Sequence, residues 1–394
     1  MKRKLATILL AAAAVLPPAN AQTDIDRILQ SVESNNLTLE ALLNENKSQK
    51  YANTGEVTLP DPEVGFSYLW GSPADAGSKK QISATQSFDF STLLGHKGAV
   101  ARSQNALLDI EYRKVRRSIL LEAKKYCYQV IYHNAVEAEL GRQLKNMEQL
   151  VEAYGRVMDE GGTEQLEYNR ARLAAALLKG ELRKNGIARS EALTQLAKLN
   201  GGNAVTLTDT SFGQIEPLPP FDVWYARAVA SDPELEYAAR IVQLRNNEVR
   251  LGKSAWAPTI TAGYEAELEP HDTYQGIALG ISLPLWGGRN RIKQAKAATL
   301  AAQSREKEVR NTLYHDMKYL YDRTQTLQQN VLMLKGEYAG LAGIKTLERN
   351  TELGNMSFVE FQVEATMYYE AMVQILSEEL EYYRSFAELN AYAL

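Results

Sequence analysis

Cysteine and histidine are scarce in this sequence, and that scarcity argues against several kinds of site. The chain of 394 residues holds one cysteine and four histidines. A single cysteine cannot form an intrachain disulfide, and Cys127 falls within a helical pattern, where we expect it to pack as a small apolar side chain. The histidines show no i, i+4 pairing that would suit a metal ion, so no metal site is expected. They are His96, His133, His271 and His315.

Motifs of common enzymes and cofactor-binding proteins are also missing from the sequence. It contains no Gly-rich phosphate loop, no G-x-S-x-G nucleophile turn and no H-E-x-x-H zinc motif. We therefore expect neither enzyme activity nor a cofactor. The formal net charge is −4, and it becomes −7 once a leader that carries Lys2, Arg3 and Lys4 is removed, which argues against nucleic acid as a partner.

Residues 1–21 have the three parts of a secretory signal. Lys2–Lys4 are basic, Leu5–Leu16 form an apolar core, and Ala19-Asn20-Ala21 is an A-x-A cleavage site. After this leader the sequence has no further apolar run of ~18 residues, the length that a membrane-spanning helix needs. The mature protein is thus predicted to be exported, and any membrane span must be built from strands.

Four short segments alternate apolar residues with small or polar ones, at the period of a β-strand. They are Glu63–Trp70, Gln81–Phe90, Thr259–Glu269 and Gly276–Leu285. The first and the last have the most apolar faces, and we predict that these faces meet lipid. The predicted lipid-facing residues are Val64, Phe66, Tyr68, Ile277, Leu279, Ile281 and Leu283.

Long helical patterns follow each pair of strands, with apolar residues at steps of three and four. The first runs from Gly95 to Glu160, which is roughly 100 Å of a single helix at ~1.5 Å per residue. A helix of that length does not fit inside a compact globule, so an elongated chain is expected. Predicted hairpin turns interrupt the two patterns, at Gly161 and Gly162 in the first half and at Gly354 and Asn355 in the second.

The order of helix, two strands and helical hairpin occurs twice. We therefore divide the chain into a signal peptide, residues 1–21, and two structural repeats, residues 22–220 and 221–394. Corresponding features lie about 190–200 residues apart, which indicates an internal duplication. Four strands of bilayer-crossing length cannot close a barrel, and open strand edges are not tolerated in lipid. Strands from several copies of the chain must therefore be combined.

At these residues the chain resembles the outer-membrane efflux protein (TolC) family. The resemblance rests on the duplicated unit, on ISLPLWGGRNRIKQAKAA at 281–298, on APTITAGYE at 257–265, and on the weaker first-half counterparts DPEVGFSY and QSFDFSTLLGHKGAVARSQ. It implies a mainly α fold with a small β part. In this fold three chains form a homotrimer with a twelve-stranded outer-membrane β-barrel, continued by a periplasmic α-helical barrel.

The resemblance also implies partners and a role. The family provides the exit duct of tripartite efflux systems, together with a periplasmic adaptor (membrane fusion) protein and an inner-membrane efflux pump. The compact mature chain is similar to the heavy-metal (cobalt-zinc-cadmium type) branch. The family further implies an acidic residue at the periplasmic tip, after each hairpin turn, as part of the channel constriction.

The residues that correspond to this tip position are Glu167 and Glu360, each six positions after a turn glycine. The family's pattern is incomplete here, because a second acidic position is Arg170 in the first half and Val363 in the second. A plainer interpretation is that both glutamates lie near helix N-termini, where negative charge is mildly favourable.

Two functions stay open on the sequence. The first is a passive exit channel for small molecules or metal ions, located in the cell outer membrane with a large periplasmic part. The second is a periplasmic coiled-coil adaptor or scaffold protein of a transport complex, which the long heptad hairpins also suit. The strands favour the channel, because an adaptor has no use for four segments of bilayer-crossing length with one apolar face.

Overall fold

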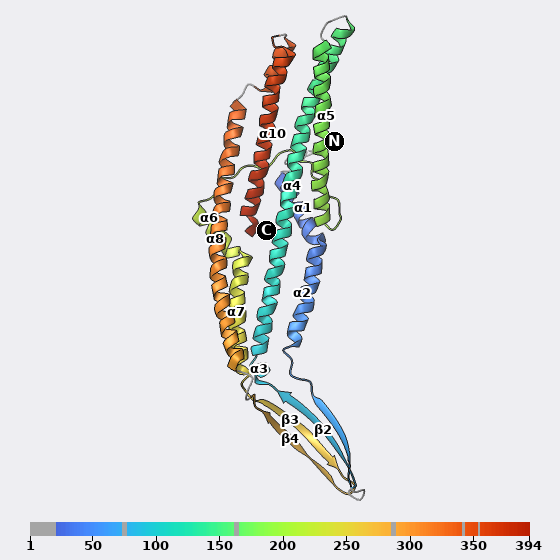
Figure 1. The fold of residues 1–394 in the computed structure, drawn as a ribbon, viewed down its shortest axis with the longest axis vertical. Coiled ribbons are helices and arrows are strands. Elements are labelled where there is room, and N and C mark those ends of the chain that lie inside the picture. The colour runs from blue at the N-terminus through green and yellow to red at the C-terminus, as the bar shows by residue number, and fades with distance from the viewer. Residues whose placement is uncertain (1–20, 73–76, 161–164, 285–288, 341–342, 354) are drawn as a thin grey trace, which may run out of the picture. The chain divides into compact units, whose positions relative to one another are not determined.

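The computed structural model describes residues 21–72, 77–160, 165–284, 289–340, 343–353 and 355–394 (Figure 1). The predicted turn residues Gly161, Gly162 and Gly354, and residues 1–20 of the predicted signal peptide, lie outside the described residues. The elements in chain order are α1 (Ala21–Asn35), α2 (Leu37–Gly55), β1 (Glu63–Trp70), β2 (Ser78–Phe88), α3 (Phe90–Leu93), α4 (His96–Asp159), α5 (Gln165–Leu199), α6 (Phe221–Ser231), α7 (Pro233–Ser254), β3 (Thr259–Leu268), β4 (Thr273–Ser282), α8 (Arg289–Gly340), α9 (Ile344–Glu352), α10 (Phe358–Leu389) and the 3-10 turn η2 (Ala391–Ala393).

The chain divides into two compact units that each take segments from both halves of the sequence. The helical unit comprises the chain up to Asn36, Leu120–Leu218 and Arg323–Glu388; the sheet unit comprises Leu37–Ile119, Pro219–Asp322 and Leu389–Leu394. The long helices α4 and α8 each contribute residues to both units. Two helices, two strands and long helices follow one another twice in the element order. The duplication of residues 22–220 and 221–394 stays a prediction.

Local signals in the sequence fix where several helices begin. Asp232 caps α7, because its carboxylate accepts hydrogen bonds from the backbone N–H groups of Glu234 and Leu235 at 2.9 and 3.2 Å. Pro233 follows at the first helical position, where its missing N–H costs nothing. Asp89 caps the short α3 in the same manner, through the backbone N–H of Thr92 at 2.7 Å. Gly343, the residue before α9, has a positive φ of 72°, a backbone conformation that favours glycine.

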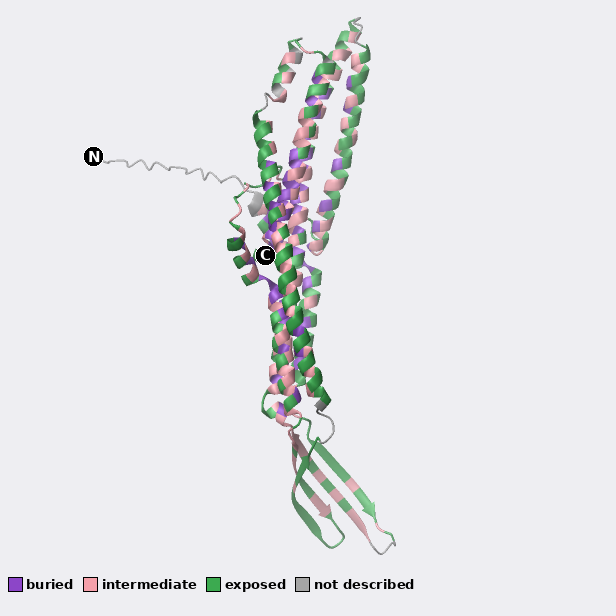
Figure 2. Ribbon diagram, turned by 60° about the vertical axis from the view of Figure 1, so that its left-hand side comes forward, coloured by how far each residue is buried: buried purple, intermediate pink, exposed green. Residues whose placement is uncertain are grey.

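The four strands form one antiparallel sheet in the order β1-β2-β3-β4. Phe66 pairs with Ile82, and Ile82 with Ala266. Tyr264 pairs with Ile277 in the last pair of strands. None of the strand residues is buried in the single chain, and Figure 2 shows the sheet without any of the buried residues that line the helices. The sheet thus lacks a hydrophobic core of its own.

The strand limits differ from the predicted ones at the turns. β2 begins at Ser78 and β4 at Thr273, three residues before the predicted starts in both strands. Backbone bonds at the two connections account for these starts: the N–H of Gly71 donates to the Gly77 carbonyl before β2, and the N–H of Glu269 donates to the Asp272 carbonyl before β4, both at 2.8 Å. The predicted end of β2 was too late. The strand was predicted to run to Phe90, but it ends at Phe88, and Phe90 is the first residue of α3.

The core of the helical unit lies along the seams of its long helices. Tyr382 of α10, Val331 of α8 and Ile131 of α4 are almost fully buried. A further cluster joins α4 to α10 through Ala135, Val136 and Leu376. Val331 and Tyr382 lie on the predicted seams of apolar residues at steps of three and four. Ile131 and Leu376 lie one position beside those seams, so the packed faces are wider than the pattern indicates. Of the helices in the described ranges, none is at once long and apolar enough to cross a membrane.

Candidate functional site

The first candidate surface is the apolar face of the sheet. The register places Val64, Phe66 and Tyr68 on the same face as Ile277, Leu279 and Ile281, with Ile82, Ala84, Ile260 and Tyr264 between them. Val64, Ile277 and Leu279 are 79%, 83% and 78% exposed. Leu283 is exposed as well and follows the last residue of β4. The predicted residues therefore share one continuous surface, and its contact with lipid stays a prediction.

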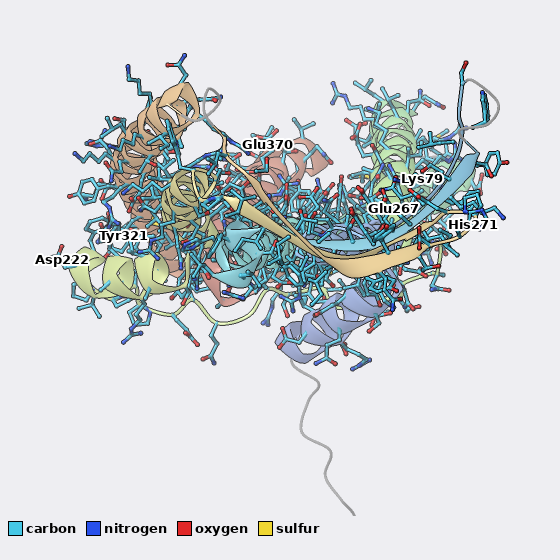
Figure 3. All side chains as sticks on the ribbon, turned by 90° about the horizontal axis from the view of Figure 1, so that it is seen from below. Lys79, Asp222, Glu267, His271, Tyr321 and Glu370 are labelled. Carbon is cyan, nitrogen blue, oxygen red and sulfur yellow. The ribbon has the colours of Figure 1, made fainter. Side chains whose placement is uncertain are left out.

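The opposite face of the sheet is mostly polar, and only Leu69 and Tyr274 place large apolar or aromatic side chains on it. Hydroxyl and amide groups meet across its strands, as in the pair Ser87 and Thr261 at 3.1 Å. Near the turns, the Lys79 ammonium pairs with the carboxylates of Glu267 and Glu269 at 2.8 and 3.2 Å (Figure 3). This face can therefore stand against water, as the lumen side of a channel would.

Gly263 marks a close approach on the polar face. A Cβ atom added there would lie 2.6 Å from the carbonyl oxygen of Ala84 and 2.7 Å from the Thr85 methyl group. Gly276, on the neighbouring strand, has no atom within 4 Å of the corresponding position. The β2–β3 pair thus requires glycine at residue 263, whereas residue 276 does not.

The two outer strands of the sheet each pair on one side only within the described chain. β1 pairs with β2, and β4 pairs with β3. Their outer edges carry backbone N–H and C=O groups that a further strand can satisfy. A sheet with one exposed apolar face and two open edges is incomplete as a membrane element in one copy.

Glu360, the first residue predicted for the constriction, caps its own helix. One of its carboxylate oxygens accepts hydrogen bonds from the N–H and the hydroxyl of Ser357, both at 2.8 Å. The N–H of Glu360 in turn donates to the Ser357 hydroxyl at 3.3 Å, which completes a capping box. The two bonds from Ser357, the backbone one first, lower the pKa of the exposed Glu360 carboxyl. The spacing Ser-x-x-Glu in the sequence carries the signal for this cap.

The other predicted tip residues lie where helices start and turn. Glu167 is in the first turn of α5 and is half-buried. Asn355 belongs to the turn before α10, where its N–H donates to the Asn350 carbonyl at 2.9 Å. Both glutamates therefore hold the N-terminal helix positions that the plainer interpretation described. A role for Glu167 and Glu360 in a constriction stays a prediction.

A groove of about 550 Å³ lies in the helical unit between α4, α5 and α10. Leu140, Met147 and Ala174 give it an apolar lining. Two buried amide atoms in it have no hydrogen-bond partner, the Nε2 atom of Gln143 and the Oε1 atom of Gln362. Such unpaired groups are costly unless something binds them. Both atoms are themselves buried, so the groove has a largely apolar surface with one unpaired donor and one unpaired acceptor beneath it.

The helical unit also contains a buried charged residue at a position where the heptad pattern would place an apolar one. Glu379 is the one polar residue in the apolar seam of α10, and it is 5% exposed. Its carboxylate pairs with the Lys335 ammonium from α8. The sequence carries no signal for this pairing, because Lys335 lies 44 positions away and no periodicity links the two residues.

The linker after α5 is fastened to three helices of the same unit. Asn134 of α4 donates to the carbonyls of Leu207 and Asp209 at 3.0 and 2.9 Å. Gln328 of α8 donates to the Glu216 carbonyl at 2.6 Å, and Tyr383 of α10 to that of Gly213. The sequence gives no signal for these bonds, because each joins residues far apart in the chain. They fix the linker to α4, α8 and α10 together.

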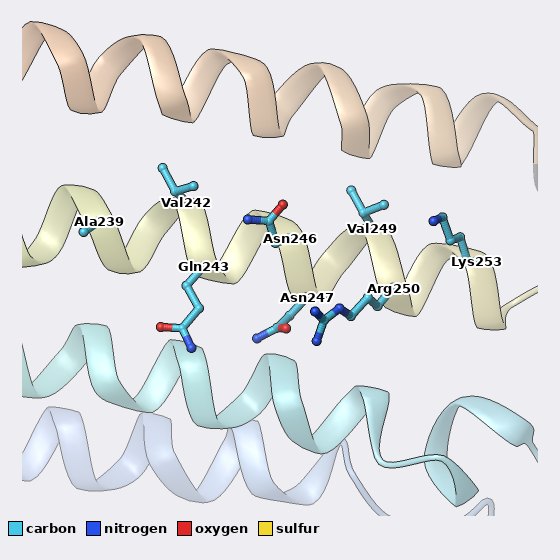
Figure 4. Close-up of a pocket in the computed structure, with 8 residues that line it drawn as sticks. All are labelled: Ala239, Val242, Gln243, Asn246, Asn247, Val249, Arg250 and Lys253. Atoms are coloured by element: carbon cyan, nitrogen blue, oxygen red, sulfur yellow. The ribbon is translucent and has the colours of Figure 1, made fainter.

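A furrow of about 520 Å³ runs along α7 (Figure 4), and its lining does not bring together side chains from different elements. All eight residues that line it come from this one helix. Val242 and Val249 point towards α8, and Asn247 points towards α4, where it donates to the Ser103 hydroxyl at 2.8 Å. These residues serve the packing of α7 against its neighbours.

Cys127 and the histidines show no arrangement for metal binding in the described ranges. No group of three or more candidate ligands comes together among those residues. Cys127 is buried, and burial raises the pKa of its thiol to about 12. The thiol therefore stays protonated at neutral pH, and the expected packing role is confirmed by its burial.

Solved structures similar to this chain include proteins and channels of the outer membrane. One is CusC, with a TM-score of 0.75 at 13% identity, over 96% of this chain and 95% of that one. A second is MtrE of Neisseria gonorrhoeae in its open state, with a TM-score of 0.70 and 14% identity, over 100% of this chain and 97% of that one. A third is VceC of Vibrio cholerae, with a TM-score of 0.71 and 13% identity, over 93% of this chain and 95% of that one. No protein-family model and no curated protein sequence matches the chain.

At this identity the likenesses establish the fold. The chain has the fold of the outer-membrane efflux channels, which its sequence resembles, along nearly its full length and theirs. The predicted fold of long helices with a small antiparallel sheet is confirmed. The comparisons do not separate the branches of the family, so the heavy-metal assignment stays a prediction.

Proposed function

We propose that the protein is the outer-membrane channel of an efflux system, a passive duct that releases small molecules or metal ions from the periplasm to the exterior. The observation that carries this proposal is the sheet, with one exposed apolar face, one polar face and two open edges. The fold shared with CusC, MtrE and VceC supports it. The same sheet disfavours the periplasmic adaptor, which would leave that apolar face in water.

The channel is proposed to be a homotrimer. Each copy would supply β1 to β4, and the open edge of β1 in one copy would pair with that of β4 in the next. Closed transmembrane barrels have at least about eight strands, so one copy is insufficient. Three copies would give the twelve-stranded barrel of the family, with the apolar faces towards lipid and the polar faces towards the lumen.

The partners proposed are a periplasmic adaptor and an inner-membrane efflux pump. The groove between α4, α5 and α10 supports a contact with the adaptor, because it offers apolar surface together with the unpaired amides of Gln143 and Gln362. A helix with an apolar face would pack against the apolar side chains of this groove.

Glu360 and Glu167 are proposed to line the narrow periplasmic end of the tube. A threefold axis would gather three copies of Glu360, and their mutual repulsion would raise the pKa of part of the ring. The cap made by Ser357 acts in the opposite direction. Such a ring would attract cations and resist anions.

The central test is to locate and weigh the wild-type protein. Fractionation should find it in the outer membrane, and recovery from the soluble periplasm would contradict the proposal. Its mass in detergent should be that of three chains. A monomer would contradict the need for strand closure, and a dimer would contradict the threefold arrangement alone.

The constriction is tested separately by single-channel conductance in planar bilayers. Glu360→Gln should weaken both the cation preference and the block by divalent cations, while the trimer stays intact. Glu364→Gln, one turn further into α10, is the matched control, and it should leave both quantities unchanged. If Glu360→Gln behaves as wild type, the constriction lies elsewhere and Glu360 only caps its helix.

A further inference from the structure

Two adjacent lysines of β2 face opposite sides of the sheet and have different surroundings. Lys79 lies on the polar face, between the carboxylates of Glu267 and Glu269. Lys80 is exposed on the apolar face, where the register sets it opposite Tyr68 of β1 and Leu268 of β3. The neighbouring rings of Tyr68 and Trp70 have their centroids 6.4 Å apart.

Lys80 is the one charged side chain on the apolar face among the described strand residues. The other residues of that face are aliphatic, aromatic, hydroxyl or amide residues, as the pairing of the four strands shows. No acidic side chain of the described strands shares the face. The charge of Lys80 is therefore without a counterion on the surface that the sheet presents.

The depth of Lys80 in the sheet is that of a membrane boundary. It lies eight positions from Phe88, at the helix-proximal end of the strand, which is about 26 Å along a strand at ~3.3 Å per residue. With a tilt of ~40°, the rise along the membrane normal is about 20 Å, close to the ~25 Å height of the apolar band of outer-membrane barrels. Lys80 thus falls at the turn end of the band, beside the aromatic residues that mark an interface.

We propose that Lys80, flanked by Tyr68 and Trp70, binds the phosphate groups of the lipid in the outer leaflet. This inference rests on the proposed function, because that function directs the turn end of the sheet outwards. A lysine at headgroup depth extends its ammonium towards anionic groups while its methylenes cover apolar surface. The absence of an acid on the described apolar face leaves lipid phosphate as its complement.

A second copy of the chain fits Lys80 less well as a source of the counterion. β2 is an inner strand, with β1 and β3 of its own chain on either side. A neighbouring copy can join the sheet only at β1 or β4, so at least one strand separates it from Lys80. Lipid, in contrast, reaches the apolar face directly above every strand.

The experiment measures lipid binding to the purified full-length protein. The assembled protein, freed of lipid in a neutral detergent, is titrated with lipid A that carries both phosphates, and native mass spectrometry counts the bound molecules. Lys80→Gln should weaken this binding about fivefold, the effect of one cationic side chain at an anionic surface. Lys80→Arg should keep it. Lys79→Gln is the matched control, and it should bind lipid A as wild type does.

Two further arms make the result decisive. With fully dephosphorylated lipid A, wild type and Lys80→Gln should bind equally, because the proposed contact is with phosphate. Equal binding of phosphorylated lipid A by wild type and Lys80→Gln overturns the inference, and so does an equal loss in Lys79→Gln. Flotation with phosphatidylcholine vesicles tests the membrane location separately, because a failure to insert there contradicts the proposed function whatever Lys80 binds.

Discussion

The sheet and the helical unit place their apolar side chains in opposite environments. Val64, Ile277 and Leu279 of the sheet are about four-fifths exposed, whereas Val331 and Tyr382 of the helical unit are 0% and 1% exposed. Most apolar side chains of the strands share one face, and no strand residue is buried by the described part of the chain. The helices find their partners within the same chain. The comparison teaches that the helical unit is stabilised by intrachain packing, while the sheet depends on lipid and on further copies.

The largest effect is expected where a charge enters the apolar face. Leu279→Arg should cost about 2–4 kcal/mol of stability in the membrane, if residue 279 faces lipid near the midplane. The measurement is the yield of folded, heat-resistant oligomer in the outer membrane. Ser282→Arg, on the opposite face of the same strand, should be tolerated. Equal yields of the two variants would mean that the exposed apolar face does not meet lipid.

The second prediction tests the buried charge of the helical unit. Lys335→Met should destabilise the protein by about 1–3 kcal/mol, because it leaves the Glu379 carboxylate buried without its cation. Adding Glu379→Leu should restore much of the loss, since replacing both partners removes the buried charge. Thermal unfolding in detergent measures both. The exposed pair Lys184–Glu181 is the control, and Lys184→Met should change stability by less than about 1 kcal/mol.

The third prediction separates two glycines of the sheet. Gly263→Ala should cost about 1–3 kcal/mol, because its Cβ would overlap the Ala84 carbonyl oxygen and the strands must move apart. Gly276→Ala should cost little, because its Cβ would meet open space. Urea unfolding in detergent compares the two variants. A similar cost for both would show that the β2–β3 spacing is easily adjusted.

The smallest effect concerns the start of α10 and its pH dependence. The cap lowers the pKa of Glu360, so it stabilises the helix fully above the pKa of a free glutamate, about 4.3. The contribution is lost as the pH falls through the lower folded-state pKa. Ser357→Ala should cost about 0.5–2 kcal/mol at neutral pH and weaken this dependence, because the hydroxyl bond to Glu360 is lost while the backbone N–H of residue 357 still donates to the carboxylate. Hydrogen exchange of the first turn of α10 measures it. Unchanged protection in Ser357→Ala would show that the cap contributes nothing.

Much of the architecture follows from sequence periodicity, because periodicity directly reflects how a helix or strand divides its surface between two environments. The alternation in Glu63–Trp70 gives β1 with its exact limits, and the steps of three and four give the buried seams of α4 and α10. The limits fail at turns. There, a backbone bond from Glu269 to Asp272 closes a tight turn, so that β3 ends at Leu268 and β4 begins at Thr273, before the alternating residues.

The features of the candidate site also fall into those that the local sequence predicts and those that it does not. The apolar face could be predicted from β1 and β4 alone, since each strand shows its own alternation. The capping box of Ser357 and Glu360 can also be predicted from the sequence, because its two residues are only three positions apart. The groove between α4, α5 and α10 could not be predicted. Whether Gln143 and Gln362 find partners depends on helices distant in the chain, and no local pattern encodes those distances.

The local sequence was enough to predict the four strands, the long helices and their order, together with the apolar face of the first and last strands. These properties depend on neighbours within a few positions, where spacing fixes direction. The three-dimensional fold was needed to learn which strands pair and in what register, and hence that Lys80 is the one charged residue on the apolar face among the described strand residues. It also decided that Lys335 is the partner of Glu379. Such pairings arise from the packing of distant segments, and many different partners are compatible with the same local pattern.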